Sequence, residues 1–307
     1  ALGEHPHLAL QRGESGVLHH PNLDRLPHNR AARVERIDLR PWLKRRKDRK
    51  LMARPSQLAL SAAGQALQSW TGPTDGLGLY LGVGREPGDD GESEPALVAA
   101  QVDGQLDEQA VAGRCRDLYP PLLPLKTLPN MALAHISIHL DVRGENGAWS
   151  GGAAAGLTAL RSAIWSIRET RCEAALVVAA DSWVSVGAVR DRLRMAASES
   201  IHSPGEAGVA LLIESMASAN RREAAVFAHV DSARHGTDVV QLEEHFPGLG
   251  RCQAADGLLA AALRIAMGGP GGWLVAQEPG QPPVGVCIDL DGVDACYAPA
   301  SEGGIHV

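Results

Sequence analysis

The sequence predicts an α/β protein whose sheet is covered by helices on both faces. Apolar runs of strand length recur along the chain, and they contain almost no polar residues where a half-exposed strand would alternate. The segments between them show helical periodicity. Continuous apolar strands that alternate with helices are typical of sheets buried on both sides. At 307 residues and 45% hydrophobic composition, the chain is long enough to bury a sizeable core.

The expected elements follow in order. The first 35 residues are rich in His, Pro, Gly and charge, and predict loop with short helical pieces. The acidic segment REPGDDGESEP, after the first strand, predicts an exposed loop. Strands are expected at 76–84, 174–180, 208–214, 224–230, 272–277 and 284–290, and helices at 56–70, 130–140, 155–169 and 253–267.

Charge and cysteine content exclude several classes of protein. The net charge of −7 does not suit a chain that wraps nucleic acid or an anionic membrane. Five cysteines lie far apart without a CxxC pair, which argues against a disulfide framework or a zinc ribbon. The chain has no run of about 20 apolar residues and no signal-like start. A cytoplasmic protein without a membrane partner is therefore expected.

A basic run, RPWLKRRKDRKLMAR, covers residues 40–54. It has two interpretations, a solvated surface or a dock for an acidic partner. Under the second interpretation Arg45, Arg46, Lys47 and Arg49 are the candidate docking residues.

A crowded turn at 150–156, SGGAAAG, leads into the predicted helix 155–169. The N–H groups at a helix N-terminus can lower the pKa of a thiol or stabilise an oxyanion. The turn, however, carries glycine and alanine where a reactive side chain would be needed. Ser150 does not fit a GxSxG elbow, because Ala148 stands at the position of the first glycine. HISIH lacks the glutamate of a zinc-protease helix, so no metal site is expected at His135 and His139.

Taken together, these segments resemble the β-ketoacyl synthases, the condensing enzymes of the thiolase fold that extend acyl chains on acyl carrier protein. RIDLRPWLKRRKDRKLMARPSQLALSAAGQAL is similar to the family's basic loop and following helix, and LPNMALAHISIHLDVRGENG to its PNM helix. SGGAAAGLTAL stands where the family has the nucleophile turn STACASGLxAI, and SPGEAGVALLIES resembles the GEGAGVLVLE strand. The resemblance implies an αβαβα sandwich in one domain, 1–307, with an N-terminal half at 1–223 and an abbreviated C-terminal half at 224–307.

The resemblance also implies that the catalytic groups are missing. Ala153 occupies the place of the catalytic cysteine, and Arg251, in GLGRCQAADGLLAAAL, that of the second catalytic histidine. LDGVDACY is similar to the terminal GFGGxNA turn but has Leu290 at the phenylalanine position. ARHGTD keeps only part of the HGTGT motif, so His235 is a weak catalytic candidate.

These departures favour a chain length factor of a type II polyketide synthase, a non-catalytic relative that pairs with an active ketosynthase. The implied partners are that ketosynthase and acyl carrier protein, without a cofactor or metal, and a reduced polyene is one conceivable product class. Met131, Leu133, His135 and Ile138 on the PNM helix are candidate tunnel-lining residues, or else ordinary interface or core residues. Two alternatives stay open: a decarboxylase of malonyl-carrier protein, which needs His235, and a scaffold that only docks carrier protein.

Overall fold

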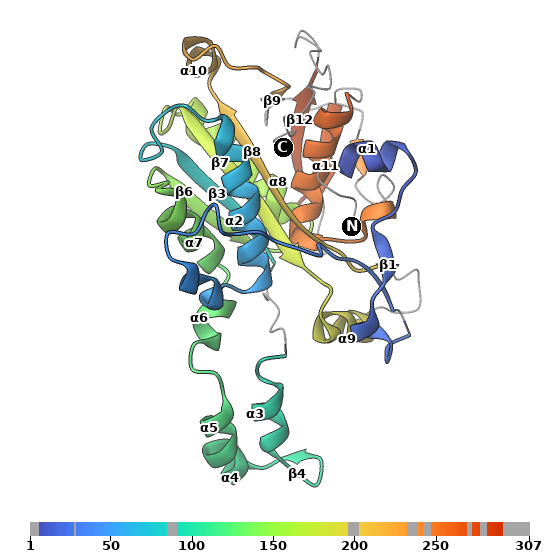
Figure 1. Ribbon diagram of the computed structural model, residues 1–307. Helices are drawn as coiled ribbons and strands as arrows, with labels where there is room; N and C mark the ends of the chain where they lie inside the picture. Colours follow the sequence, from blue (N-terminus) through green and yellow to red (C-terminus); the bar gives the residue numbers. More distant parts are fainter. Residues whose placement is uncertain are drawn as a thin grey trace.

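The computed structural model describes residues 6–27, 29–84, 91–195, 203–231, 239–241, 247–268, 272–276 and 281–290 (Figure 1). Its central feature is a four-stranded sheet in the order β6-β3-β7-β8. Strand β3 (Gly78–Val83) pairs in parallel with β6 (Asn146–Ser150) and with β7 (Ala174–Ser182), and β7 pairs antiparallel with β8 (Glu206–Glu214). Every residue of β3 and β7 is buried, as a sheet covered on both faces requires.

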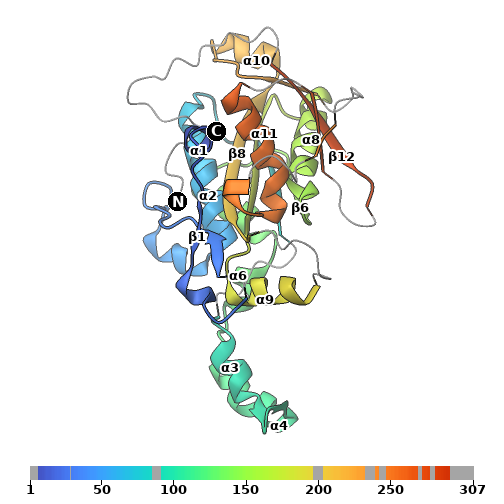
Figure 2. The ribbon, with the colours of Figure 1, turned by 90° about the vertical axis from the view of Figure 1, so that its right-hand side faces the viewer.

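Helices cover the two faces of this sheet. Helices α2 (Arg54–Ala66) and α7 (Met131–Leu140) pack together on one face. Helices α8 (Ala154–Arg168) and α11 (Asp256–Met267) pack on the other (Figure 2). Helix α8 buries the face formed by Leu157, Leu160 and Ile164, which is the periodicity that predicted it. The predicted helices at 56–70, 130–140, 155–169 and 253–267 are therefore confirmed, with shifts at their ends.

A second sheet lies on the far side of α8 and α11, in the order β10-β11-β12-β9. Its strands are β9 (His229–Asp231), β10 (Val239–Gln241), β11 (Gly272–Ala276) and β12 (Val284–Asp289). Helix, sheet, helix and sheet thus follow one another, so the described residues form four of the five layers of the αβαβα sandwich expected from the sequence. The strand predicted at 224–230 is wrong in extent: within the described residues His229–Asp231 pairs with β12, and 224–228 form no strand.

The N-terminal segment contains more regular structure than predicted. Strand β1 (Val17–His19) pairs antiparallel with β2 (Arg30–Ala32) to form a small ribbon, where loop was expected. Other short elements are α1 (Pro6–Gln11), η1 (Pro21–Leu23), η2 (Arg46–Leu51), η3 (Leu67–Ser69), α9 (Val186–Met195), α10 (Met216–Arg221), η6 (Pro247–Leu249) and η7 (Gln253–Ala255).

Residues 91–127 form an arm that projects from the body in both side views (Figures 1 and 2). The sequence did not predict this arm, and the loop expected at 85–95 already turns helical at Glu94. Its elements are α3 (Glu94–Ala99), β4 (Gln101–Val102), β5 (Gln105–Leu106), α4 (Glu108–Ala110), the π-helical turn η4 (Val111–Cys115), α5 (Arg116–Leu118) and α6 (Leu123–Thr127). Within the described ranges, no helix combines the length and apolar character needed to cross a membrane.

Candidate functional site

The turn before α8 joins an edge strand to a helix N-terminus. The N–H of Gly151 donates to the carbonyl of Val83 at 3.0 Å, and α8 begins at Ala154 with Ala153 as its N-cap residue. Ala153 has only a methyl group, so it accepts no hydrogen bond from the helix and offers no nucleophile. The Ser150 hydroxyl donates to the carbonyl of Gly84 at 3.2 Å. The turn therefore has the dipole of a long helix but no reactive side chain.

Close packing explains why this turn consists of small residues. A Cβ on Gly82 of β3 would lie 2.5 Å from the backbone nitrogen of Gly156. A Cβ on Gly156 would lie 3.0 Å from the carbonyl oxygen of Ala254, and one on Gly257 would lie 2.8 Å from that of Ala153. The backbones of β3, α8 and the start of α11 thus approach too closely for side chains. The two turns that the sequence assigned to lost catalytic residues lie against each other.

Arg251 lies just before the turn at 252–256 that leads into α11, and it contacts other residues of the chain. Its Nε lies 3.6 Å from Oδ2 of Asp256 in the first turn of α11, and its backbone N–H donates to the carbonyl of Ser203 at 2.8 Å. A guanidinium stays protonated, so it cannot serve as the neutral hydrogen-bonding base that a histidine provides. The geometry suits a structural role for Arg251.

The neighbouring thiol of Cys252 does not replace the missing nucleophile. The residue is buried, and its backbone N–H donates to Oδ1 of Asp256 at 2.7 Å. Burial raises the pKa of the Cys252 thiol well above its usual range, and the carboxylates of Asp256, Asp181 and Glu206 raise it further. The reactive thiolate is therefore suppressed at this position.

Asp181, at the end of β7, is a buried acid that the sequence reasoning missed. Its carboxylate accepts N–H groups from Ser182 at 2.8 Å, the indole of Trp183 at 3.0 Å and Ala254 at 3.3 Å. Burial nonetheless dominates and raises the pKa of Asp181 to about 6. Asp181 ties the end of the central sheet to the turn that carries Arg251. An acidic residue directly after a long apolar strand was the signal available in the sequence.

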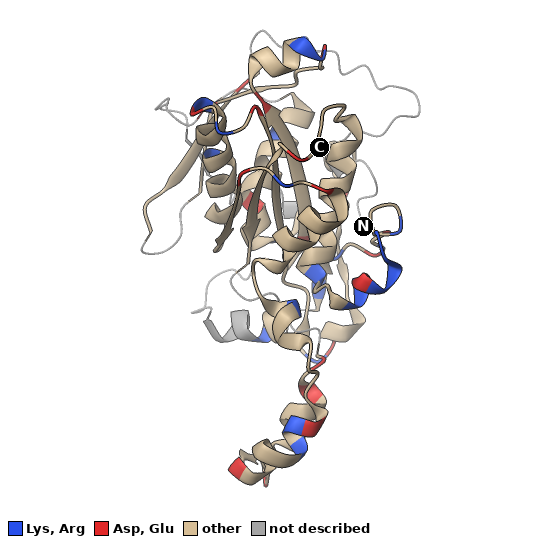
Figure 3. Ribbon diagram, turned by 90° about the vertical axis from the view of Figure 1, so that its left-hand side faces the viewer, with Lys and Arg blue, Asp and Glu red and all other residues tan. Residues whose placement is uncertain are grey.

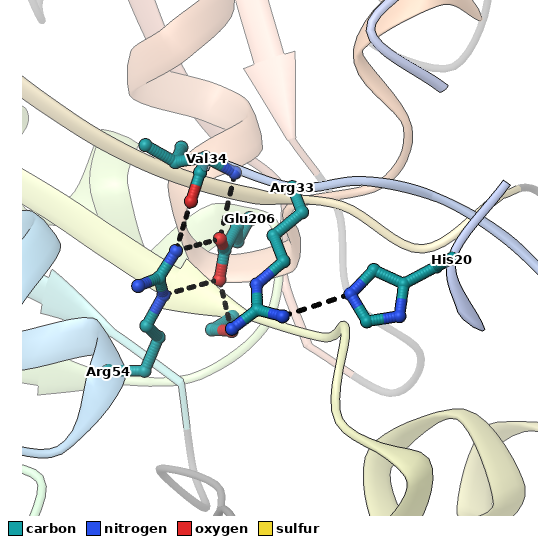
Figure 4. Close-up of polar contacts among 6 residues, drawn as sticks. His20, Arg33, Val34, Arg54 and Glu206 are labelled. Carbon is teal, nitrogen blue, oxygen red and sulfur yellow. Dashed lines mark hydrogen bonds and ion pairs between the residues drawn. The ribbon is translucent and has the colours of Figure 1, made fainter. Parts of the chain in front are cut away.

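A buried ion pair holds the N-terminal segment to the body (Figure 4). Both oxygens of Glu206, whose side chain is fully buried, contact the guanidinium of Arg54 at 2.5 and 3.0 Å. Glu206 also accepts the N–H of Val34 at 2.9 Å and the hydroxyl of Ser182 at 2.7 Å. Nearby, Arg33 donates to Nε2 of His20 at 3.0 Å. The pair joins α2, β7, β8 and the segment that follows β2 in one network.

The tunnel-lining candidates on α7 lie in different environments. Met131 and Leu133 are half-buried, whereas Ile138 is 54% exposed in this chain. His135 is buried, and its Nε2 lies 3.3 Å from the carbonyl of Leu51. Met131, His135 and Ile138 share one side by helical spacing, and Leu133 is on another. The structure therefore groups three of the four, and their tunnel-lining role stays a prediction.

The two histidines of HISIH connect α7 to the basic segment. The rings of His135 and His139 stack with centroids 6.0 Å apart, and Nδ1 of His139 accepts the N–H of Lys44 at 3.3 Å. Burial lowers the pKa of both rings, while the Asp48 carboxylate opposes this at His139. Within the described residues, no group of three or more metal-ligating side chains comes together.

The basic run forms an exposed surface beside a cavity. Most of η2 carries Lys or Arg, and the charge is visible along that segment in Figure 3. Arg45 pairs with the buried Asp48 at 3.0 Å. A cavity of about 830 Å³ opens next to η2, and it is lined by Arg46, Lys47, Arg49, Lys50, Met52, Ala53, Gln57, Glu92, Leu123, Lys126 and Thr127. The predicted docking residues Arg46, Lys47 and Arg49 lie together there, and Lys126 joins them from a distant part of the sequence.

The arm exposes apolar side chains that the rest of the described chain does not cover. Leu106 is 74% exposed, and the other large apolar residues of the arm and its base are exposed to lesser degrees: Leu97, Val98, Val102, Val111, Leu118, Tyr119, Leu122, Leu125 and Leu128. Strand β6, at the edge of the first sheet, pairs with β3 alone in the part of the chain that the structure describes. Exposed apolar patches and open sheet edges mark interaction surfaces.

Two predicted positions cannot be placed. His235 lies outside the described residues, and so does the terminal turn after Leu290. The weak catalytic assignment of His235 and the comparison of 290–297 with the family's last turn therefore stay predictions.

A sequence model of the beta-ketoacyl synthase N-terminal domain matches residues 22–210, which is more than half of the chain. The chain belongs to the β-ketoacyl synthase family. The match includes η2, α7, the α8 turn and most of β8, so it covers the first half of the sandwich. The turn at 150–156, with Ala153, lies within the matched residues.

Solved structures of other proteins share this fold. A chain of the ishigamide ketosynthase/chain length factor aligns with a TM-score of 0.66 at 19% identity, covering 92% of this chain and 93% of the other. A chain of AntDE:AntF, a type II PKS acyl-carrier protein in complex with its ketosynthase bound to the hexaketide, aligns with a TM-score of 0.63 at 14% identity, covering 84% and 90%.

A beta-ketoacyl synthase from Burkholderia phymatum STM815 aligns with a TM-score of 0.57 at 19% identity, covering 74% of this chain and 60% of the other. A search of curated protein sequences finds no significant match. At these identities the structures establish the fold.

Proposed function

We propose that this chain is a non-catalytic chain length factor that pairs with an active ketosynthase in type II polyketide biosynthesis. The observation that carries the proposal is the turn before α8. It keeps the close packing of a helix N-terminus against β3 and α11, but its apex residue, Ala153, cannot form a covalent thioester. A chain built in this way can shape an acyl site while a partner supplies the chemistry.

The exposed surfaces support an obligate partner. The arm presents leucine and valine side chains to solvent, and β6 has an unpaired edge among the described residues. A chain with these surfaces is expected to bury them against a second subunit. The ishigamide ketosynthase/chain length factor, whose fold this chain shares, is a ketosynthase with such a factor. Co-expression with a cysteine-bearing ketosynthase from the same gene neighbourhood should yield a stable complex.

The basic segment supports acyl carrier protein as the second partner. Exposed Lys and Arg side chains on η2 complement an acidic surface, and such contacts mainly set the association rate and its salt dependence. AntDE:AntF, which shares the fold, contains a type II PKS acyl-carrier protein with its ketosynthase.

Product length is the readout that separates a length-determining subunit from a scaffold. In the reconstituted complex, Ile138→Trp on α7 should shorten the polyketide, because added bulk on the tunnel side limits chain growth. Met131→Trp is a second test on the same side of the helix. Gln65→Trp, at an exposed position of α2, is the control and should leave the product length unchanged. An unchanged length distribution for both α7 variants, in complexes that still form, would contradict the proposal.

A further inference from the structure

The cavity beside η2 has walls from three separate parts of the chain. Residues of η2 form one wall, the start of α2 with Ala53 and Gln57 forms another, and α6 of the arm base contributes Leu123, Lys126 and Thr127. Five of its lining residues are cationic: Arg46, Lys47, Arg49, Lys50 and Lys126. One lining residue, Glu92, is acidic.

The charges of this cavity are largely uncompensated. Among the described residues, Asp48 of η2 pairs with Arg45 and lies 3.8 Å from Nε2 of His139, and none of these three residues lines the cavity. The four η2 cations that line the cavity make no ion pair within that part of the chain. Like charges gathered around one cavity repel each other and raise the local concentration of anions. The cavity is therefore suited to an anionic group from outside the chain.

Glu92 shows where such a group would sit. Its carboxylate pairs with Nζ of Lys126, whose side chain is only 12% exposed. Glu92 itself is 43% exposed at the base of the arm, just before α3, so solvent reaches this carboxylate. Of the five cations that line the cavity, Lys126 is the one shielded from water, and it is paired with the solvent-accessible carboxylate of Glu92. A carboxylate from another molecule can exchange with Glu92 at this position.

We propose that Glu92 occupies, in the free chain, the position beside Lys126 that a carboxylate of acyl carrier protein takes on docking, so that the chain's own carboxylate competes with its partner. The inference deepens the proposed function and rests on it. A carboxylate is the favoured ligand because a carboxylate already fits at Lys126. An acidic helix is favoured over a small anion because the remaining cations are exposed along η2, where several acidic side chains can be bound together.

The consequence is competition between Glu92 and the carrier protein. A bound carrier carboxylate takes the Lys126 ammonium only after Glu92 has left it. Removing the charge of Glu92 should therefore strengthen the binding of carrier protein. The gain should exceed that from removing another negative charge close to the cavity. Partly exposed ion pairs are weak, so the expected gain is about two- to fivefold in affinity.

The experiment uses the complex of this chain with its ketosynthase and the acyl carrier protein encoded beside it, with affinity measured by isothermal titration calorimetry at low and high salt. Glu92→Gln is compared with Glu94→Gln, which removes the same charge two residues away from an exposed side chain that does not line the cavity. We expect tighter binding for E92Q and a smaller change for E94Q. Equal affinities for the two variants would overturn the inference.

Two further variants separate this inference from the proposed function. Lys126→Met should weaken the binding of carrier protein. When E92Q or E94Q is added to Lys126→Met, the two double variants should bind carrier protein with equal affinity. Full affinity in Lys126→Met would also overturn the inference, and if that variant does not fold, the E92Q and E94Q pair decides alone. Arg46→Glu tests the docking surface as a whole. If wild type shows no salt-dependent binding and Arg46→Glu changes nothing, the carrier-docking function fails, and the inference fails with it.

Discussion

The turn before α8 and the cavity beside η2 differ in the physical reason for the residue types found there. At the turn, packing explains each small side chain, since Gly82, Gly156 and Gly257 face backbone atoms at distances that exclude a Cβ. At the cavity, packing does not explain the cations of η2, because Arg46 and Lys47 lie on an exposed segment and make no ion pair within the described chain. The comparison teaches that close packing is enough to account for the residues of the turn, whereas the cations beside η2 call for an explanation from outside the chain, which the proposed docking of an acidic partner supplies.

The largest expected effect on stability comes from the buried ion pair of Arg54 and Glu206. Glu206→Ala should lower the free energy of unfolding by about 3–5 kcal/mol, because it leaves the Arg54 guanidinium, the Val34 N–H and the Ser182 hydroxyl without their acceptor. Chemical denaturation measures this change. The exposed pair of Asp38 and Arg40 provides the control, and Arg40→Ala should leave the midpoint unchanged. A loss below 1 kcal/mol in Glu206→Ala would show that the network is not structural.

Asp181 gives the stability of the protein a pH dependence. Its pKa is raised to about 6, above the value of 3.8 for an unperturbed Asp, so the folded state binds the proton more tightly than the unfolded state. The stability from this group is therefore fully present below pH 4 and is lost as pH rises to about 6, a loss of about 3 kcal/mol. The negative charge of Asp256 also contributes to the raised pKa of Asp181.

The measurement for Asp181 is the free energy of unfolding of wild type and Asp181→Asn from pH 4 to pH 7. The difference between the two proteins should change by about 3 kcal/mol across this range in favour of the variant, since the amide does not titrate. Parallel curves would contradict the assignment of a raised pKa to this carboxyl.

Close packing at the turn predicts a smaller but specific cost. Gly82→Ala should destabilise the protein by about 1–3 kcal/mol, because its Cβ would lie 2.5 Å from the nitrogen of Gly156 and neither backbone can move freely. Gly187→Ala is the matched control, since that glycine lies in α9 with no atom within 4 Å of the added carbon. It should be neutral or stabilising by up to about 1 kcal/mol. Equal thermal midpoints for the two variants would show that the turn tolerates side chains.

The sequence predicted the parts of the fold that are buried by the chain itself. Strands β3 and β7 and helices α2 and α8 were found because continuous apolar runs and 3.6-residue periodicity reflect burial. The arm at 91–127 was missed for the same reason. Its apolar residues, such as Leu106 and Leu122, face solvent, so they follow no periodicity that a core would impose.

The sequence predicted the features of the candidate site that lie within one continuous segment, and it missed those that combine distant segments. The motif at 150–156 located the turn before α8, and the charge run located η2, while the loss of a nucleophile at Ala153 stays a prediction. The sequence could not show that Lys126 joins η2 across 75 or more residues, or that Asp181 reaches the N–H of Ala254. Such groupings depend on tertiary contacts between distant segments.

The most direct test of the central claim is intact-mass spectrometry of both subunits after the complex has been loaded with acyl-carrier protein. The account predicts an acyl mass increase on the ketosynthase partner and none on this chain, because Ala153 has no atom that can accept the acyl group and the Cys252 thiol is buried with a raised pKa. A substrate-derived adduct on this chain, mapped to the turn at 150–156, would contradict it.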